Sequence, residues 1–496
     1  MPGMQTRHLR HRKMSRKCWP SLIKPSVCSP ALVHPPAWDR RWLGIAVSLL
    51  VAGLVWLAPL PAGLSQAGRE ALAVTLFTVV WWIFNVTPPA YATLLMLLGY
   101  MLLGLATPEQ VFHIWTMPLM WLIIAAFLLA AAVTKSGLAQ RVAYFFMLRY
   151  ATSYRSLIVL TYGLGLVLSL LIPHPFPRAL LVMAVMGAII QQARMERSNV
   201  AALGLSVFVA TTATSMIFLT GDSTLNIAIV GFSGVTVGWL DWIKYMAVPG
   251  IVASLAMLGL FLLVFPQRGP VTIDHAALRA EQQKLGPITR REVVTLAWVL
   301  AALALWATDF LHHIDPAWVA LGAVVGLSLP VVGDVLDAKD ISTGVNWPII
   351  FFVMGALAIG AVGKATGLSE WLAASLLPAT PPQNPYVFAA LVGGATMLIH
   401  MVLGSALACM SIVAPPMVQY AAATGMNPLV PALIIYTAVS IHYLLPFQHV
   451  TILLGQGEVG GYDSRQVLRY GLPLTLVVFV VIILVEVTWW QFVGLL

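Results

Sequence analysis

Two apolar stretches of this chain are each interrupted by a short run of polar residues. The first run supplies hydroxyl, carboxyl and amide groups, from Thr220, Asp222, Ser223, Thr224 and Asn226. The second supplies imidazole, amide and hydroxyl groups and a proline, from His442, Pro446, Gln448, His449 and Thr451. Such groups are costly inside an apolar helix unless they face a cavity. Each run should therefore break its helix, which frees N–H groups that suit an anion and carbonyl groups that suit a cation.

Two longer apolar stretches, residues 155–193 and 386–421, are interrupted near their middles. The interruptions are Pro173-His174-Pro175-Phe176-Pro177-Arg178 and Gly404-Ser405-Ala406. Non-helical backbone is tolerated at membrane depth only where protein or a water-filled cavity satisfies it. We therefore expect two re-entrant helical hairpins, with four substrate-binding candidates at their tips: His174, Phe176, Arg178 and Ser405. The two polar runs supply the other substrate-binding candidates, which are Thr220, Ser223, Thr224, Asn226, Pro446, Gln448, His449 and Thr451. The tips and the runs together would form an anion site with little formal charge.

The candidates for holding a coupling ion are Asp222, Ser405, His400 and His442. The carboxyl group of Asp222 could coordinate a cation, carry a proton or cap the following half-helix, and the two imidazoles could titrate near neutral pH. Arg178 could clamp an anion through its guanidinium fork or extend toward the edge of the membrane. Glu486 lies within the last apolar stretch, where we expect a paired or protonated structural residue.

The composition favours a membrane protein that crosses the bilayer several times. Of its 496 residues, 60% are hydrophobic and 9% are charged, whereas an average soluble protein has about 25% charged residues. The net charge of +9 is concentrated in residues 1–41, which hold nine of the 27 Lys and Arg and one acid. A nucleic-acid-binding domain would spread such charge over a folded face. The composition thus excludes a soluble enzyme, a nucleic-acid-binding domain and a disordered protein.

Apolar segments of about 20 residues indicate membrane crossings, and eleven are expected in addition to the two hairpins. They lie near 42–60, 71–86, 90–106, 117–135, 200–231, 243–265, 293–311, 317–333, 347–364, 429–455 and 471–494. With the N-terminus in the cytoplasm, 23 of the 27 Lys and Arg fall on the cytoplasmic side. The positive-inside rule favours this orientation, in which Arg178 is the only basic residue inside the membrane.

The two halves of the chain resemble each other at a nearly constant offset. Pro118 and Pro348, like Gly137 and Gly367, are 230 residues apart. We expect a basic tail (1–41), a first transmembrane helix (42–60), repeat one (71–265, with hairpin 155–193), a cytoplasmic linker (266–292) and repeat two (293–494, with hairpin 386–421). Because each repeat has five crossings, the second would be inverted in the membrane, as in many secondary transporters.

Enzyme, nucleotide and metal motifs do not change this interpretation. Residues 455–460 match GxGxxG but close a membrane helix, so they carry no nucleotide-binding weight. The three cysteines, Cys18, Cys28 and Cys409, show no metal-binding spacing. A membrane-embedded enzyme would need a catalytic dyad or metal cluster, and the sequence offers only scattered His and acidic residues. We therefore predict no enzyme activity, no cofactor and no metal centre.

Several segments resemble the divalent anion/sodium symporter family over about residues 70–494. They are Gly238-Trp239-Leu240-Asp241-Trp242 with Val248-Pro249-Gly250, then His313-Ile314-Asp315-Pro316-Ala317, and the two hairpin tips. The family includes di- and tricarboxylate carriers and sulfate-type permeases. The resemblance implies an all-α integral membrane fold, alternating access, a small anionic substrate and a homodimer in the bilayer, here the cell inner membrane.

Both tips depart from the Ser-Asn-Thr signature that supplies sodium ligands in the family. The first copy is His174-Pro175-Phe176, and the second keeps Ser405 but has Leu407 in place of threonine. Hard cations prefer the oxygen ligands that are missing here, which argues against sodium coupling. Sodium ions or protons as coupling ions, anion exchange and facilitated transport therefore all stay open. We predict a di- or tricarboxylate transporter; the alternative is an inorganic-anion permease (sulfate or arsenite type) or an exchanger without sodium coupling.

Overall fold

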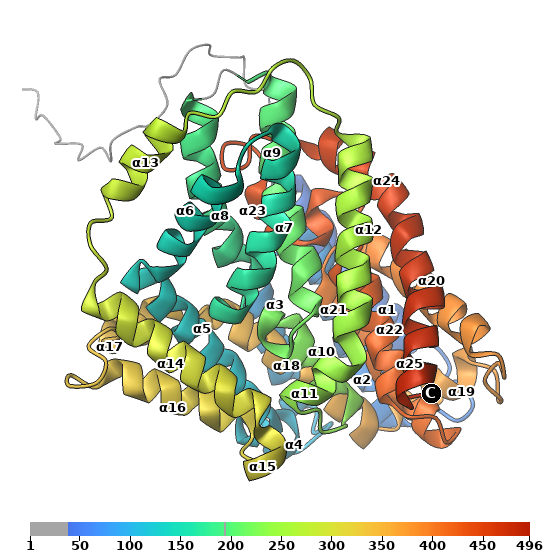
Figure 1. Cartoon of the computed structure of the whole chain (residues 1–496). Coiled ribbons are helices and arrows are strands. Elements are labelled where there is room, and N and C mark those ends of the chain that lie inside the picture. The colour runs from blue at the N-terminus through green and yellow to red at the C-terminus, as the bar shows by residue number, and fades with distance from the viewer. Residues whose placement is uncertain (1–37, 193–194) are drawn as a thin grey trace, which may run out of the picture. The chain divides into compact units, whose positions relative to one another are not determined.

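The computed structural model describes residues 38–192 and 195–496 (Figure 1). Every regular element of these residues is a helix, as the composition predicts. Residues 40–496 form one compact unit. The tail of residues 1–37, including Cys18 and Cys28, and Arg194 lie outside the described residues, so the expectations placed on them stay predictions.

After α1 (Trp38–Leu57), one series of elements runs from α2 to α12. It comprises α2 (Gln66–Phe84), α3 (Pro89–Leu102), α4 (Pro108–Val111), η1 (His113–Thr116), α5 (Pro118–Ser136), α6 (Leu138–Tyr150), α7 (Tyr154–Leu171), α8 (Pro175–Gln192), α9 (Arg197–Ala213), η2 (Thr214–Met216), η3 (Leu219–Asp222), α10 (Leu225–Ser233), α11 (Trp239–Trp242), the π-helical turn η4 (Ile243–Ala247) and α12 (Val248–Val264). A short helix, α13 (His275–Gln283), lies in the expected linker.

A second series with a similar order follows the linker. It comprises α14 (Arg290–Ala307), α15 (Asp309–His312), α16 (Pro316–Ser328), α17 (Ala338–Gly344), α18 (Trp347–Ala365), α19 (Leu368–Leu376), α20 (Pro385–Leu403), α21 (Ala406–Ala423), α22 (Leu429–Ser440), η5 (Pro446–Gln448), α23 (Val450–Gly455), α24 (Ser464–Val480), the π-helical turn η6 (Val481–Glu486) and α25 (Val487–Val493).

Nine segments of the described chain are long and apolar enough to cross a membrane, and three of them are hairpin helices: α7, α20 and α21. Several expected crossings form shorter apolar helices, among them α3, α16 and α22. The expected fifth and tenth crossings are each two helices separated by irregular or 3-10 backbone. The count of eleven crossings and their boundaries stay a prediction.

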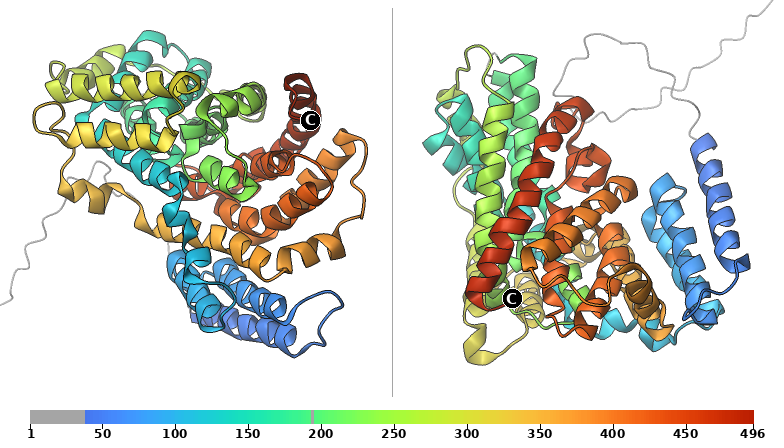
Figure 2. Two further views of the ribbon diagram at one scale, coloured as in Figure 1. Left: turned by 90° about the horizontal axis from the view of Figure 1, so that it is seen from below. Right: turned by 90° about the vertical axis from the view of Figure 1, so that its right-hand side faces the viewer.

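Each series packs one of its helices against a helix of the other series. The helix pair α5 and α18 carries the 230-residue offset, and α3 and α16 occupy matching places in the element order. In the structure α3 packs on α18, whereas α16 packs on α5. Seen from below, α2 and α3 (blue) lie apart from α14 and α16 (yellow), with α5 and α18 nearer the centre (Figure 2, left). Such reciprocal packing is expected when two copies of a repeated unit each place the matching helix against the other copy.

The hairpin turns follow from local sequence. Helix α7 ends at Leu171, and prolines on both sides of His174 prevent the helix from continuing, because proline lacks an N–H donor and clashes with the preceding turn. In the second hairpin, Gly404 adopts a left-handed conformation (φ 63°) that favours glycine. The next residue, Ser405, caps α21 by accepting from the N–H of Ala408 at 3.4 Å. In each hairpin the two helices contact each other.

A polar contact between the series ties α6 to the start of α14. The guanidinium of Arg141 donates to both carboxylate oxygens of Glu292, at 2.5 and 3.2 Å, and to the carbonyls of Gly286 and Pro287. Burial raises the pKa of Glu292, but hydrogen bonds from Arg141 and Thr289 outweigh burial, so its pKa lies below the usual value. The contact therefore stabilises the fold only while Glu292 is ionised.

We predict that Glu292→Gln lowers the melting temperature at pH 7, because Arg141 keeps a neutral partner in place of a paired charge. A hydrogen bond to a charged group contributes about 1.5–3 kcal/mol and one between neutral groups about 0.5–1.5 kcal/mol, so the substitution should cost about 1 kcal/mol. A group whose pKa is depressed by folding stabilises above its unfolded pKa, about 4.3, and this stabilisation disappears as the pH falls through the folded value. The wild-type melting temperature should therefore drop below about pH 4.3 more steeply than that of the variant. Parallel pH curves would contradict this role.

Candidate functional site

Arg178 is the most deeply buried cation of the described chain, with 0% of its surface exposed. It does not extend to the edge of the membrane, and its terminal nitrogens are used within the protein. One donates to the carbonyls of Ile172 at 2.8 Å and Gly221 at 2.7 Å. The other donates to the carbonyl of Thr211 at 3.0 Å and the hydroxyl of Ser215 at 2.5 Å. Arg178 thus joins the first hairpin tip to the break between α9 and α10.

Four further carbonyls at this break are also paired with side-chain donors. The amide nitrogen of Asn226 donates to the carbonyls of Ser215 at 3.0 Å, Phe218 at 2.9 Å and Leu219 at 3.2 Å. The indole of Trp242 donates to the carbonyl of Met216 at 3.0 Å. Side-chain donors therefore take the place of the helical N–H groups that the break removes.

Asp222 satisfies the opposite backbone groups of the same break. Its Oδ1 accepts from the N–H groups of Thr224 at 2.9 Å and Leu225 at 3.2 Å, and so caps α10. Close packing shapes the backbone here: a Cβ on Gly221 would lie 2.2 Å from the carbonyl oxygen of Ser215. Of the roles open to Asp222, the structure shows the helix cap. A carboxylate and a guanidinium therefore fix the two ends of the first break.

The second break, between α22 and α23, is closed by neutral groups. The Oε1 of Gln448 accepts from the N–H groups of Leu444 at 2.6 Å and Leu445 at 2.7 Å. His400, from the second hairpin, contacts the carbonyl of Gln448 through Nε2 at 3.1 Å. The Nδ1 of His449 accepts from the N–H of Thr451 at 3.3 Å. Gln448 and His449 thus accept from N–H groups as Asp222 does in the first break, while His400 contacts a carbonyl, and no arginine takes part.

Each break contacts the hairpin of the other series. Helix α10 packs on α21 of the second hairpin, and α23 packs on α8 of the first. His449 lies close enough to Asp222 and His174 to interact with both electrostatically. The rings of His400 and His442 are 5.9 Å apart, and His400 is also in electrostatic range of His449. The four interruptions predicted from the sequence therefore converge in one region.

The hairpin tips contribute unequally to this region. His174 is buried, its ring centre lies 5.4 Å from that of Phe127, and its Nδ1 accepts from the N–H of Phe176 at 3.3 Å. Phe176 and Ser405 are half-buried. Pro446 is buried at the start of η5, and Thr220 accepts from the indole of Trp239 at 3.3 Å. His442 contacts Thr475 through Nε2. Glu486 is paired with Thr437 and lies on η6, outside the breaks.

Several buried polar atoms of the two breaks have no hydrogen-bond partner. In the first break they are the hydroxyl oxygens of Ser223 and Thr224 and the Oδ1 of Asn226. In the second they are the hydroxyl of Thr451 and the Nδ1 atoms of His400 and His442. An unpaired buried polar group costs about 1–3 kcal/mol, so such a cluster is expected where a polar ligand or water completes the bonds.

Sequence reasoning missed some members of this region. Ser215 and Thr211 sit in an apolar helix and gain their roles only because Arg178 reaches them. Ser440 precedes the polar run that marks the second break, and Tyr443 lies within that run. Their one detectable signal was proximity to a predicted break.

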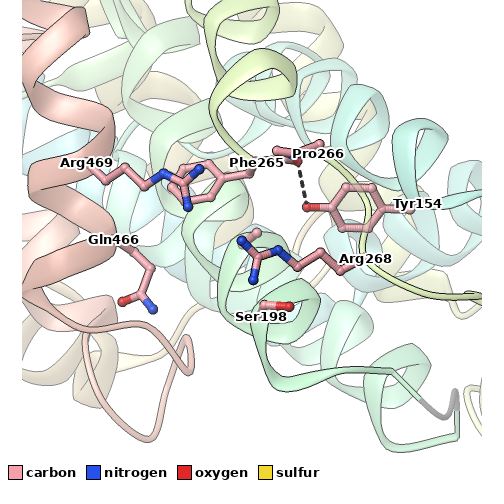
Figure 3. A pocket seen from close by; sticks show the side chains of 8 residues that line it. Tyr154, Ser198, Phe265, Pro266, Arg268, Gln466 and Arg469 are labelled. Carbon is pink, nitrogen blue, oxygen red and sulfur yellow. Dashed lines mark hydrogen bonds between the residues drawn. The ribbon is translucent and has the colours of Figure 1, made fainter.

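A separate cavity of about 180 Å³ opens between the ends of α7, α9, α12 and α24. Figure 3 shows the guanidinium groups of Arg268 and Arg469 directed into it, with the Tyr154 hydroxyl bonded to the backbone of Phe265. Arg469 lies over the Phe265 ring, 5.5 Å from its centre. No lining residue belongs to the four interruptions, so this cavity is not part of the candidate site.

Known proteins resemble this chain over most of its length. A "Membrane protein" of Cupriavidus necator is 24% identical over 94% of this chain and 95% of its own. The "Dicarboxylate transporter 1, chloroplastic" of Arabidopsis thaliana is 27% identical, and the match spans 70% of this chain and 65% of that protein. The "Putative malate transporter YflS" of Bacillus subtilis is 23% identical, over 66% and 70%.

The fold has a counterpart among solved structures. Neisseria gonorrhoeae MtrF, described as one of a class of antimetabolite efflux pumps, superposes with a TM-score of 0.50 at 16% identity, covering 92% of this chain and 96% of that one. At this identity the likeness concerns the fold alone. The family profile described as "Sodium:sulfate symporter transmembrane region" matches residues 39–496, and the chain therefore belongs to the sodium:sulfate symporter family.

Proposed function

We propose that this protein is a secondary transporter of dicarboxylates that works by alternating access. The observation that carries the proposal is the set of unpaired buried hydroxyls at two converging helix breaks. The names of the Arabidopsis and Bacillus relatives, which are a dicarboxylate and a putative malate transporter, support this substrate class. Transport would leave the substrate chemically unchanged, so we propose no enzyme activity.

The site would bind a dianion mainly through neutral donors. The buried charges of Arg178 and Asp222 oppose each other and are both engaged with backbone groups. Ser223 and Thr224 lie at the N-terminus of α10, where the helix dipole favours negative charge. Thr451 offers a third hydroxyl, which belongs to the second break. Donors from both breaks suit a ligand with a carboxylate at each end.

In this account the hairpins and broken helices move together against the remaining helices, and the substrate is exposed to each side of the membrane in turn. His400, His442, Ser405 and Asp222 stay the proposed positions for a coupling ion. We also propose a homodimer in a cell inner membrane, as the family resemblance implies, with the bilayer and the anion as the other partners. An inorganic anion such as sulfate is the second candidate substrate, because the family description names it.

Initial uptake into proteoliposomes distinguishes these substrates. We expect saturable uptake and counterflow of labelled succinate or malate, and recovery of the substrate unchanged. Saturable uptake of sulfate without dicarboxylate uptake would favour the second candidate, and uptake of neither would contradict both.

The double variant Ser223→Ala/Thr451→Ala should raise the KM for the dicarboxylate at least tenfold, since two hydroxyl donors to a charged ligand are each worth about 1.5–3 kcal/mol. The matched control is Thr295→Ala. The Thr295 hydroxyl is also buried and unpaired, but it lies on α14, away from the interruptions. Equal KM values for the double variant and the control would contradict the proposed site.

Asp222→Asn keeps an oxygen that can cap α10 but removes the negative charge, which leaves Arg178 buried without an opposing charge. We expect uptake to fall at least tenfold while the protein still reaches the membrane. Asp241→Asn is the matched control, because Asp241 accepts from the N–H of Gly238 at 3.0 Å and caps α11 at an exposed position. Uptake by Asp222→Asn at the wild-type rate would contradict a role of the Asp222 charge in transport and would leave this residue only the role of a helix cap.

The proposed orientation puts Arg279 on the cytoplasmic side and Lys364 on the opposite side, and both are exposed in the structure. In a cysteine-free background, Lys364→Cys should react with a membrane-impermeant maleimide in intact cells. Arg279→Cys should react only after the membrane is opened. The reverse pattern would contradict the cytoplasmic N-terminus.

A further inference from the structure

The family name implies a sodium ion, and freed carbonyls of broken helices are where transporters hold such ions. In the first break these carbonyls do not fit a sodium site. Those of Thr211 and Gly221 accept from Arg178, and those of Ser215, Phe218 and Leu219 accept from Asn226. The nearby hairpin tip supplies no replacement, because an imidazole, a proline and a phenyl ring follow Pro173.

The guanidinium also excludes a second cation by its charge. Two like charges about 4 Å apart, at an effective dielectric constant of about 20, repel by an amount equivalent to roughly a thousandfold in binding. The charge of Asp222, which would otherwise attract a cation, is already opposed by Arg178. Sodium would have to contact the same oxygens that Arg178 contacts at 2.7–3.0 Å. A free ion and this side chain therefore compete for one set of ligands.

The second break shows the contrast. Its hairpin carries Cys409 where the first carries Arg178, since each is the fourth residue of its helix, α21 and α8 respectively. Its backbone is closed by Gln448, His400 and His449, and it keeps unpaired imidazole and hydroxyl atoms. The resident positive charge is thus a property of the first break and not of both.

We propose that Arg178 is a tethered cation that permanently occupies the position of an ion in the first break and holds the first hairpin tip to α9, η2 and η3. This half of the site is then assembled without sodium, and the tip and the break move as one body. The inference goes beyond the proposed function, because it concerns a resident charge and holds for any substrate.

The test uses the purified full-length protein in detergent without substrate. Arg178→Ala removes the tethered charge and leaves its oxygen ligands free. Its melting temperature is measured in low-millimolar guanidinium chloride and in choline chloride at equal ionic strength. Arg149→Ala is the matched control, since Arg149 is exposed on α6 and contacts the ring of Tyr150.

We expect Arg178→Ala to melt lower than the wild type and to be stabilised by guanidinium in a saturable way, because a ligand that binds only the folded state raises stability with its concentration. The wild type and Arg149→Ala should show no such stabilisation. A folded Arg178→Ala protein that does not respond to guanidinium would overturn the proposal.

A second pair of variants decides the matter if Arg178→Ala does not accumulate. Arg178→Lys keeps the charge and Arg178→Gln keeps donors without the charge. We expect the lysine variant to be the more stable, although less stable than the wild type because an ammonium lacks the guanidinium fork. Equal or greater stability of Arg178→Gln would overturn the proposal. These readouts do not depend on uptake, so failure of the dicarboxylate proposal would be recognised separately.

Discussion

Everything in the described part of this protein that bears on function depends on one constraint. A helix that is broken inside an apolar environment frees N–H and carbonyl groups that the apolar surroundings cannot satisfy, and each needs a hydrogen-bond partner. The chain meets this requirement twice, with different chemistry. The first break uses a guanidinium, a carboxylate and an amide, and the second uses an amide and imidazoles.

This constraint separates the polar residues into two groups. Arg178, Asp222, Asn226 and Gln448 are engaged mainly with backbone groups and maintain the breaks. The hydroxyls of Ser223, Thr224 and Thr451 are buried and unpaired, so they are the atoms available to a ligand. An anion bound among them meets donors held in place by the first group, which reduces the cost of ordering the site when the anion binds.

The sequence was informative where a pattern has a direct physical meaning. Polar runs in apolar helices predicted both breaks, and prolines or a Gly-Ser pair predicted both turns, because proline and left-handed glycine end helices locally. The role of Arg178 was not predictable. The sequence suggested an anion clamp or an extension toward the membrane edge. Neither alternative included hydrogen bonds to the carbonyls of Thr211 and Gly221, which lie 33 and 43 residues away in the chain. Pairings at that separation are set by tertiary packing.

The most direct test of this account is a structure of the protein with a bound dicarboxylate. The account predicts ligand density between the N-terminus of α10 and the second break, within hydrogen-bonding distance of Ser223 or Thr224 and of Thr451, with Arg178 still bonded to the carbonyls of Gly221 and Thr211. Ligand density bonded to the Arg178 guanidinium, or only in the cavity of Arg268 and Arg469, would contradict it.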